Sequence, residues 1–241
     1  MNKAWNQFTK IRKRYRTEIE KLIRQAPELQ GLQQRLVDSR SASYTVETPI
    51  VYNCALDDVQ ADSEIRMILV GDNPGRREQA AENRRYLVGP SGKIAEKFFR
   101  ENPSLNIDFR KNVIILNKTP IHTPRTIELK ELCRLGGPAL EKILVQSQQF
   151  MARLLLEFQQ ALDVPVWITG YSEMKKGGVF EAYTNELKTI YDSTALQESV
   201  FLYRHFSMNQ FTIDLKQQAA PGESLAKTLN RIGTAYRARF L

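Results

Sequence analysis

The chain has 241 residues, of which 42% are hydrophobic and 26% are charged, and its formal net charge is +8. It is long enough to bury one sizeable core, and it has no apolar run of the roughly 18 residues that a transmembrane helix needs. Its two cysteines exclude a disulfide framework and a four-thiolate metal site. These features predict a cytoplasmic protein with no metal, no cofactor and no membrane contact, and the positive charge favours a polyanionic partner.

The segment 1–45 is predicted to form a basic helical extension. Apolar side chains recur at three- and four-residue spacing from Trp5 to Ile23, which is typical of an amphipathic helix, and Pro27 is expected either to end it or to begin the next helix. A shorter amphipathic segment follows at 29–36. We expect the apolar stripe to pack against the rest of the protein, while the basic face either lengthens a nucleic-acid contact or is ordinary surface.

Four short apolar runs bounded by turn-forming residues predict buried strands. They lie at 65–70, 112–116, 164–169 and 200–205. Amphipathic patterns predict helices, the first of them capped by Ser91. These helices are expected at 93–101, 128–134, 138–162, 180–190 and 225–236. The segment 48–56 fits either a short strand or an extended approach to the core.

This alternation of strands and helices is typical of a parallel sheet that is covered by helices on both faces. The sequence therefore predicts an α/β fold, a three-layer α/β/α sandwich around a central four-stranded parallel sheet. We expect 1–241 to form a single domain, in which 60–215 is the core and 1–45 is the helical extension.

The clearest sign of chemistry follows the first strand, where Gly71-Asp72-Asn73-Pro74-Gly75 forms a turn-rich box. In open α/β sheets the ligand binds beyond the carboxyl ends of the strands, which is where Asp72 and Asn73 stand. Gly71 and Gly75 allow the backbone to approach a ligand closely, and Pro74 stiffens the turn.

Polar residues also follow the second and fourth strands, namely Asn117, and then His205 and Ser207. Each has an ordinary alternative when it is taken alone: Asn117 as a turn former, and His205 as a core histidine. Asp72 could equally bond to its own turn. Because parallel strands end at one edge of their sheet, we expect these residues to converge on one ligand.

Basic residues cluster beside this box. Arg76, Arg77, Arg84 and Arg85 lie between it and Lys93. Their position beside the box favours a nucleic acid as the partner. We expect the protein to be a monomer.

The motifs resemble those of the uracil-DNA glycosylase superfamily. The box at 71–75 and the later Tyr86-Leu87-Val88-Gly89-Pro90-Ser91-Gly92 are similar to its G-x-x-P-G and F-V-G-x-x-G segments. The strand V-I-I-L-N, with Pro124 after it, resembles the segment that ends in a uracil-reading Asn, here Asn117. His205-Phe206-Ser207 resembles the H-P-S motif. The order and spacing agree over about 60–215, and the first 55 residues lie outside the resemblance.

This resemblance implies a DNA glycosylase that hydrolyses the N-glycosidic bond of uracil or a related deaminated base during base excision repair. Asp72, helped by Asn73, would orient the attacking water, and His205 would stabilise the leaving base. Asn117 would read the edge of a base that has been flipped out of the duplex. Backbone amides of 71–75 would complete the pocket.

The resemblance also suggests contacts around the base. Tyr86 is the candidate for stacking on it, and Leu87 is the strict positional match. The implied partner is DNA, and Ser207 would clamp a phosphate. The basic residues near the box would contact further phosphates, which would make binding strongly salt-dependent; they are Arg76, Arg77, Arg84, Arg85 and Lys93. Met208 or Phe211 would serve as an apolar wedge in the base stack.

The chain departs at several positions from the bacterial and archaeal family four type, its closest subgroup by pattern, which implies a bacterial source. Asp72 stands where that type has a catalytic Glu, and Asn73 stands where other members have Asn, so the choice between them stays open. His122 stands where a cluster-ligating Cys is found, and Phe206 replaces the Pro of H-P-S.

Two alternatives remain from the sequence. One is a catalytically degenerate member of the superfamily that binds nucleic acid without excising a base. The other is a small-molecule or nucleotide hydrolase or transferase on an ordinary doubly wound sheet, since a fold does not fix a function.

Overall fold

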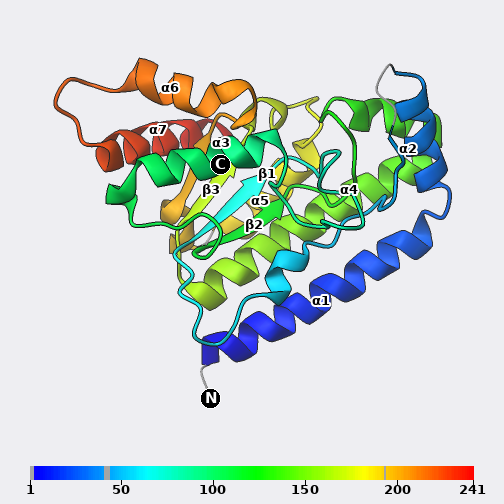
Figure 1. Ribbon diagram of the computed structural model, residues 1–241, viewed down its shortest axis with the longest axis horizontal. Coiled ribbons are helices and arrows are strands. Elements are labelled where there is room, and N and C mark those ends of the chain that lie inside the picture. Colours follow the sequence, from blue (N-terminus) through cyan, green and yellow to red (C-terminus); the bar gives the residue numbers. More distant parts are fainter. Residues whose placement is uncertain (1–2, 41–43, 193) are drawn as a thin grey trace.

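The computed structural model describes residues 3–40, 44–192 and 194–241. Within them, a sheet of four parallel strands lies at the centre of the molecule (Figure 1). The strands are β1 (Met67–Gly71), β2 (Val113–Asn117), β3 (Val166–Thr169) and β4 (Val200–Tyr203). Their order is β2-β1-β3-β4, and the register pairs Gly71 at the end of β1 with Asn117 at the end of β2.

Helices cover both faces of this sheet. They are α1 (Lys3–Gln25), α2 (Leu29–Asp38), α3 (Pro90–Glu101), α4 (Glu128–Leu162), α5 (Glu181–Tyr191), α6 (Gln210–Gln218) and α7 (Leu225–Phe240). Figure 1 shows α3, α6 and α7 on one side of the sheet and α4 with α1 on the other, and α5 packs along α4. This arrangement is the predicted three-layer α/β/α sandwich. Of the described helices, none has both the length and the hydropathy that crossing a bilayer requires.

The strands form where apolar runs are buried on both faces. β1, β2 and β3 are buried along their whole length, as parallel strands between two helical layers must be. All four predicted strands are present, with ends shifted by no more than two residues. The segment 48–56 adds no strand to this sheet. It makes one antiparallel bridge, from Ile50 to Ile121, and then a short 3₁₀ turn at Cys54–Asp57.

The helices differ from the prediction in three places. α4 joins the two helices expected at 128–134 and 138–162 across a kink at Gly137, where φ is 65° and ψ is −163°. The prediction that Ser91 caps α3 is wrong, because the helix begins at Pro90, a residue well suited to a first helical position. α6 was not predicted, since its weak pattern buries only Phe211 and Asp214.

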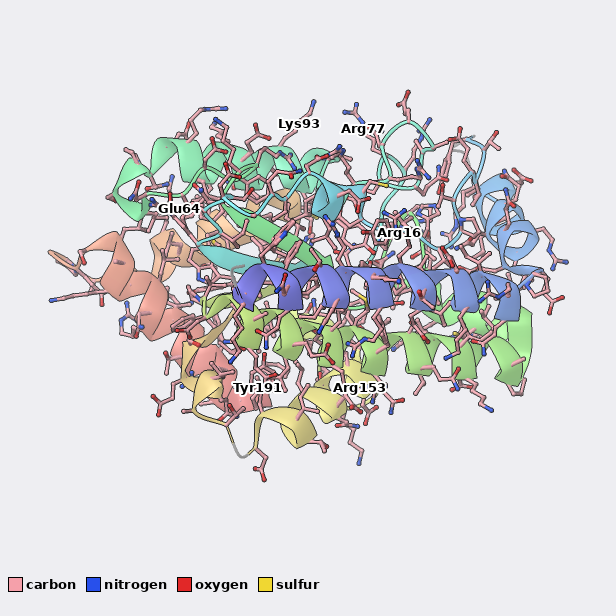
Figure 2. All side chains as sticks on the ribbon, turned by 90° about the horizontal axis from the view of Figure 1, so that it is seen from below. Arg16, Glu64, Arg77, Lys93, Arg153 and Tyr191 are labelled. Carbon is pink, nitrogen blue, oxygen red and sulfur yellow. The ribbon has the colours of Figure 1, made fainter. Side chains whose placement is uncertain are left out.

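The N-terminal helix packs on α4 through its apolar stripe, as expected (Figure 2). One residue of that stripe, Tyr15, also reaches the segment beside the turn-rich box. Its hydroxyl lies 2.7 Å from the hydroxyl of Tyr86, which in turn lies 2.6 Å from the carbonyl oxygen of Val51. The hydrophobic core extends from Phe8 of α1 to Tyr236 of α7, and so it reaches beyond the 60–215 segment on both sides.

The basic face of α1 is partly neutralised by the protein itself. Arg14 forms an ion pair with Glu157 of α4, and Arg16 lies 2.7 Å from a carboxylate oxygen of Asp57. These pairs favour ordinary surface over a nucleic-acid contact for this part of the helix.

Candidate functional site

A cavity of about 560 Å³ opens at the carboxyl edge of the sheet. The chain connections reverse direction at β1, since β2 lies on one side of it and β3 on the other. Ligands of open α/β sheets bind at such a reversal point. The predicted site residues that line the cavity are Asp72, Asn73, Gly75, Arg76, Arg77, Leu87, Asn117, His205, Ser207 and Met208. The structure therefore brings residues from the ends of β1, β2 and β4 to one place.

Asp72, which follows β1, is paired with a buried lysine. Nζ of Lys118 lies 2.6 Å from Oδ1 of Asp72 and also donates to the carbonyl of Thr169. The Lys118 side chain is fully buried, whereas that of Asp72 is 15% exposed. Burial lowers the pKa of Lys118, and attraction to the Asp72 carboxylate acts against that shift. Lys118 was not predicted as a site residue, although a charged residue directly after a buried strand is a signal that could have identified it.

Asn73 is held at both ends of its side-chain amide. Nδ2 donates to the hydroxyl of Thr123 at 2.9 Å, and Oδ1 accepts from the hydroxyl of Thr126 at 3.1 Å. The same Thr126 hydroxyl lies 3.2 Å from Oδ2 of Asp72. A hydroxyl has one hydrogen to donate, so when it serves Asn73 the Oδ2 atom of Asp72 is left to accept from a water or a ligand. These contacts favour Asp72 over Asn73 as the residue that acts on a ligand.

Asn117 ends β2 and contributes an amide to the cavity. It is 2% exposed, and its Nδ2 has no hydrogen-bond partner among the described residues. A buried donor without a partner costs about 1–3 kcal/mol, so this atom is a strong candidate for binding a ligand acceptor. Gly71 makes room for the side chain, because a Cβ at that position would lie 2.6 Å from Oδ1 of Asn117. Gly71 thus seats Asn117 rather than lining the cavity itself.

His205 follows β4 and is partly buried. Its Nδ1 accepts a hydrogen bond from the backbone N–H of Ser207 at 3.0 Å, which leaves Nε2 to carry the proton of the neutral ring. Burial lowers the pKa of His205, the Asp72 carboxylate raises it, and the Lys118 ammonium lowers it. The side chain is therefore a neutral N–H donor at neutral pH.

The neighbours Tyr86 and Leu87 have different surroundings. Leu87 lines the cavity with a backbone φ of 52°, and a Cβ at Gly92 would lie 1.6 Å from the Leu87 carbonyl oxygen. Tyr86 is 1% exposed, and its hydroxyl contacts Tyr15 and Val51. Tyr86 therefore belongs to the core, which corrects the expectation that it stacks on a ligand. The apolar contact of this segment with the cavity comes from Leu87.

The turn after β4 separates the two wedge candidates. Met208 is 84% exposed and has a left-handed backbone, with φ of 52°. Phe211 is 3% exposed, and its ring stacks on that of Phe206 with the centroids 4.3 Å apart. The expectation of a wedge is therefore wrong for Phe211, and Met208 is the residue whose exposure suits that role. Phe206, at the position of the Pro in H-P-S, fills the aromatic core.

Positive charge gathers at the rim of the cavity. Arg76 and Arg77 are exposed there, as expected, and Arg125 joins them without having been predicted, although its Nε lies 2.8 Å from Oε1 of Glu128. Lys93 lines a neighbouring cavity instead, and in Figure 2 its side chain projects from the same edge of the molecule as that of Arg77. The rim therefore presents arginine side chains to any ligand that enters.

Two of the predicted phosphate contacts lie away from this cavity. Arg84 is exposed, with a φ of 43°, and its carbonyl accepts from the amide of Cys54. Arg85 forms an ion pair with Asp58. Neither lines the cavity in the described part of the chain.

Glu78 is a carboxyl group of the cavity wall that was not predicted. It is 6% exposed, and its Oε2 accepts from the Gly75 amide at 3.1 Å. Burial raises the pKa of Glu78 to about 7, while hydrogen bonds from the backbone of Gly75, Leu87 and Gly89 lower it. Glu78 thus joins the 71–75 turn to the 87–89 segment. No local pattern marks it, because folding alone brings its backbone partners together.

We expect the Glu78→Gln variant to lose a pH dependence of stability that the wild type has. Because folding raises the pKa of this carboxyl from 4.5 to about 7, the folded protein binds more protons than the unfolded chain between those values. The stabilisation of the folded state by the Glu78 carboxyl is therefore fully present below pH 4.5 and is lost as the pH rises through 7. Urea unfolding measures this effect. The free energy of unfolding of the variant, relative to that of the wild type, should rise by about 2–3 kcal/mol between pH 5 and pH 8. Parallel pH profiles of the two proteins would contradict this account.

His122 supports the turn-rich box from behind. Its Nδ1 lies 2.8 Å from the carbonyl oxygen of Pro74, and its Nε2 lies 2.8 Å from the hydroxyl of Tyr44. Burial lowers the pKa of His122 to about 4, so the ring is neutral at neutral pH, with Nδ1–H donating to Pro74 and Nε2 accepting from Tyr44. This histidine therefore holds the backbone of the box in place.

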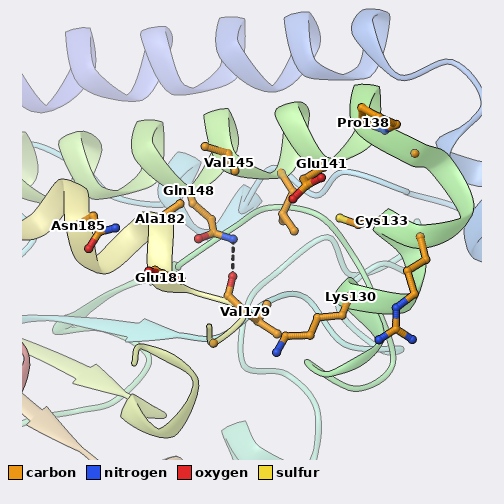
Figure 3. Close-up of a pocket in the computed structure, with 14 residues that line it drawn as sticks. Lys130, Cys133, Pro138, Glu141, Val145, Gln148, Val179, Glu181, Ala182 and Asn185 are labelled. Atoms are coloured by element: carbon orange, nitrogen blue, oxygen red, sulfur yellow. Dashed lines mark hydrogen bonds between the residues drawn. The ribbon is translucent and has the colours of Figure 1, made fainter. Parts of the chain in front are cut away.

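A second cavity, of about 690 Å³, lies between α4 and α5 (Figure 3). Two of its polar side chains bond to the protein itself: Gln148 donates to the carbonyl of Val179 at 2.9 Å, and Lys130 donates to that of Gly177 at 2.8 Å. Burial raises the pKa of Cys133 to about 11, so its thiol stays protonated at neutral pH. The cavity at the carboxyl edge holds an amide donor that has no partner in the described part of the chain, together with a carboxylate and an imidazole, and it is the candidate site.

The described residues contain no group of three or more His, Cys, Asp or Glu side chains that could hold a metal ion. The cavity at the carboxyl edge combines a carboxylate, a neutral imidazole, an amide donor and a rim of arginines. A scan against protein-family models and a search of the curated proteins each find no match to this chain.

Proposed function

We propose that this protein is a DNA glycosylase that hydrolyses the N-glycosidic bond of uracil or a related deaminated base. The observation that carries the proposal is the meeting of Asp72, Asn117 and His205 in one cavity, where Nδ2 of Asn117 lacks a partner among the described residues. The cavity volume of about 560 Å³ is within the usual range for small-ligand sites.

The groups of the cavity suit a deaminated base. Such a base has carbonyl oxygens at its edge, to which Nδ2 of Asn117 can donate, and Leu87 offers apolar surface for the face of the ring. As the bond between C1′ and the base nitrogen breaks, its electron pair leaves with the base and charge develops on a carbonyl oxygen. Nε2–H of His205 would stabilise that charge.

A water molecule then completes the hydrolysis. Its oxygen bonds to C1′, while one of its protons passes to solvent and the departing base is protonated later. The carboxylate of Asp72 would orient this water through Oδ2 and offset the positive charge that builds up on the sugar. Hydrolysis needs no further reactant.

The surroundings of the cavity suit an extruded nucleotide. Arg76, Arg77 and Arg125 supply positive charge for backbone phosphates. The exposed Met208 side chain can fill the space in the stack that a flipped base leaves, and Ser207 beside it offers a hydroxyl to a phosphate.

The test is a cleavage assay with labelled oligonucleotides. Uracil is placed in single strands, opposite guanine and opposite adenine, and hypoxanthine and xanthine substrates are run beside it, with alkali to reveal abasic sites. We expect the wild type to release at least one of these bases and the Asp72→Asn and His205→Ala variants to lose that release. Salt-sensitive DNA binding without any base release would favour a degenerate, non-catalytic relative. If the protein neither releases a base nor binds DNA, a role on DNA is excluded.

The Arg77→Ala variant should weaken DNA binding about equally on all sequences and reduce the slope of log K against log [salt] by about 1, as expected for one lost phosphate contact. Arg153→Ala is the matched control, because Arg153 pairs with Glu186 of α5 and projects from the opposite edge of the molecule (Figure 2). Fluorescence anisotropy over a range of salt concentrations measures both slopes. Equal slopes for Arg77→Ala and the wild type would mean that Arg77 does not contact a DNA phosphate.

A further inference from the structure

Lys118 is a fully buried charge beside the cavity, at the carboxyl ends of three neighbouring strands. Its Nζ lies 2.6 Å from Oδ1 of Asp72 and 3.4 Å from the carbonyl oxygen of Gly71, and it also donates to the carbonyl of Thr169. An ammonium group has three N–H donors, and these three oxygens use them all. Lys118 therefore has no donor left for a ligand, so any effect that it has on one must pass through Asp72.

Gly170 completes the seat of the Asp72 carboxylate. It follows β3 with a φ of 80°, and a Cβ at this position would lie 2.4 Å from Oδ1 of Asp72. Glycine thus leaves the space into which the carboxylate fits, and Lys118 holds it there. With Oδ1 fixed in this way, Oδ2 is the oxygen that stands beside Thr126 at the cavity.

We propose that Lys118 is a positioning residue, which locks Oδ1 of Asp72 so that Oδ2 faces the ligand and which balances the carboxylate charge beside His205. The inference rests on the proposed function, because Asp72 and His205 are the residues to which that function assigns the chemistry. It adds a third residue, which touches neither the substrate nor the water.

The balance of charge matters for His205. The charged groups that act on its ring are Asp72, from the end of β1, and Lys118, from the end of β2. With Lys118 in place the carboxylate is neutralised close by, and the ring stays neutral with its proton on Nε2. Without Lys118, the uncompensated carboxylate would attract a second proton to the imidazole.

The Lys118→Met variant removes the charge and keeps an unbranched side chain. The chain has two histidines, so NMR titration of the ring nitrogens can follow each one. We expect the titration midpoint of His205 to move to higher pH in Lys118→Met and to return toward the wild-type value in Asp72→Asn/Lys118→Met. His122, which has its own buried partners, is the internal reference and should not move.

Base release supplies a second readout. The single-turnover rate on uracil-containing DNA should fall by about 10²-fold in Lys118→Met, as for other misplaced catalytic groups, while the affinity for DNA stays unchanged. Gly170→Ala should lower the rate of base release in the same way. Its Cβ would push the Asp72 carboxylate away from Lys118, while both charged side chains remain in the protein.

The outcomes separate this inference from the proposed function. If Lys118→Met loses stability while His205 titrates as in the wild type, Lys118 is a structural residue alone and the inference is wrong. An unchanged rate of release in Gly170→Ala, from an active wild type, overturns it equally. If the wild type releases no base, the proposed function fails, and the NMR titration still decides whether Lys118 sets the protonation of His205.

Discussion

Replacing Asp72 by Asn should lower the stability of the folded protein by about 3 kcal/mol near pH 7. The substitution keeps the size of the side chain and removes the charge that faces Lys118, whose side chain is fully buried. A buried ammonium without its counter-ion is costly, whereas the lost attraction itself is a smaller effect. Urea unfolding should therefore give a lower midpoint with an unchanged m value.

This loss should shrink as the pH rises. Burial lowers the pKa of Lys118, and Asp72 opposes the shift, so the Asn variant lowers that pKa further. Between the folded pKa and the ordinary value of about 10.4, the unfolded chain then binds more protons than the folded protein, and stability rises with pH over that window. A loss of equal size at pH 6 and at pH 9 would contradict the ion-pair account.

Two variants control this experiment. Asp72→Asn/Lys118→Met removes both charges and should recover most of the lost stability, because uncharged replacements of a buried pair are well tolerated. Asp57→Asn removes a carboxylate that is 36% exposed and pairs with Arg16, and it should cost no more than about 1 kcal/mol. The contrast between the two aspartates isolates the effect of burial.

The fold could be predicted because apolar runs report burial directly. The runs that end at Val70 and Leu116 are short and mostly aliphatic, and their alternation with helical patterns is typical of a parallel sheet with both faces covered. That sheet in turn places the residues after each strand at one edge. α6 could not be predicted, because it buries only Phe211 and Asp214 and its apolar residues therefore form a weak helical pattern.

The surroundings of the site residues could not be predicted in the same way. Tyr86 and Leu87 are neighbours, and the left-handed backbone at Leu87, with φ of 52°, helps to decide which of them meets the cavity. Glu78 gains its role only when the amides of Gly75 and Gly89 come together. Spacing along the chain indicates which residues share an edge of the sheet, whereas the direction of a loop side chain depends on packing that the sequence pattern does not contain.

His205→Ala should lower the single-turnover rate of base release by about 10²–10³-fold, with little change in the affinity for DNA. Under the proposed function, the variant removes the donor that would face the charge developing on the base, and that charge is absent from the bound substrate. His205→Gln keeps an N–H donor of similar reach and should lose less. Rates are measured with protein in excess over uracil-containing DNA, so that product release does not limit them. Equal rates for wild type and His205→Ala would exclude this role.

The pH dependence of the same reaction distinguishes a neutral imidazole from a charged one. Nδ1 of His205 accepts from the N–H of Ser207, which a cationic ring cannot do, since both of its nitrogens are donors. Burial also lowers the pKa of His205, so the neutral ring prevails at neutral pH. The ratio of the wild-type rate to the His205→Ala rate should therefore hold steady as the pH rises from about 6.5 to 8. A ratio that falls about tenfold per pH unit would require a protonated ring and the loss of the Ser207 hydrogen bond. The hydrogen bond from Ser207 and the rate profile thus test the same hypothesis, that a neutral His205 ring stabilises the leaving base.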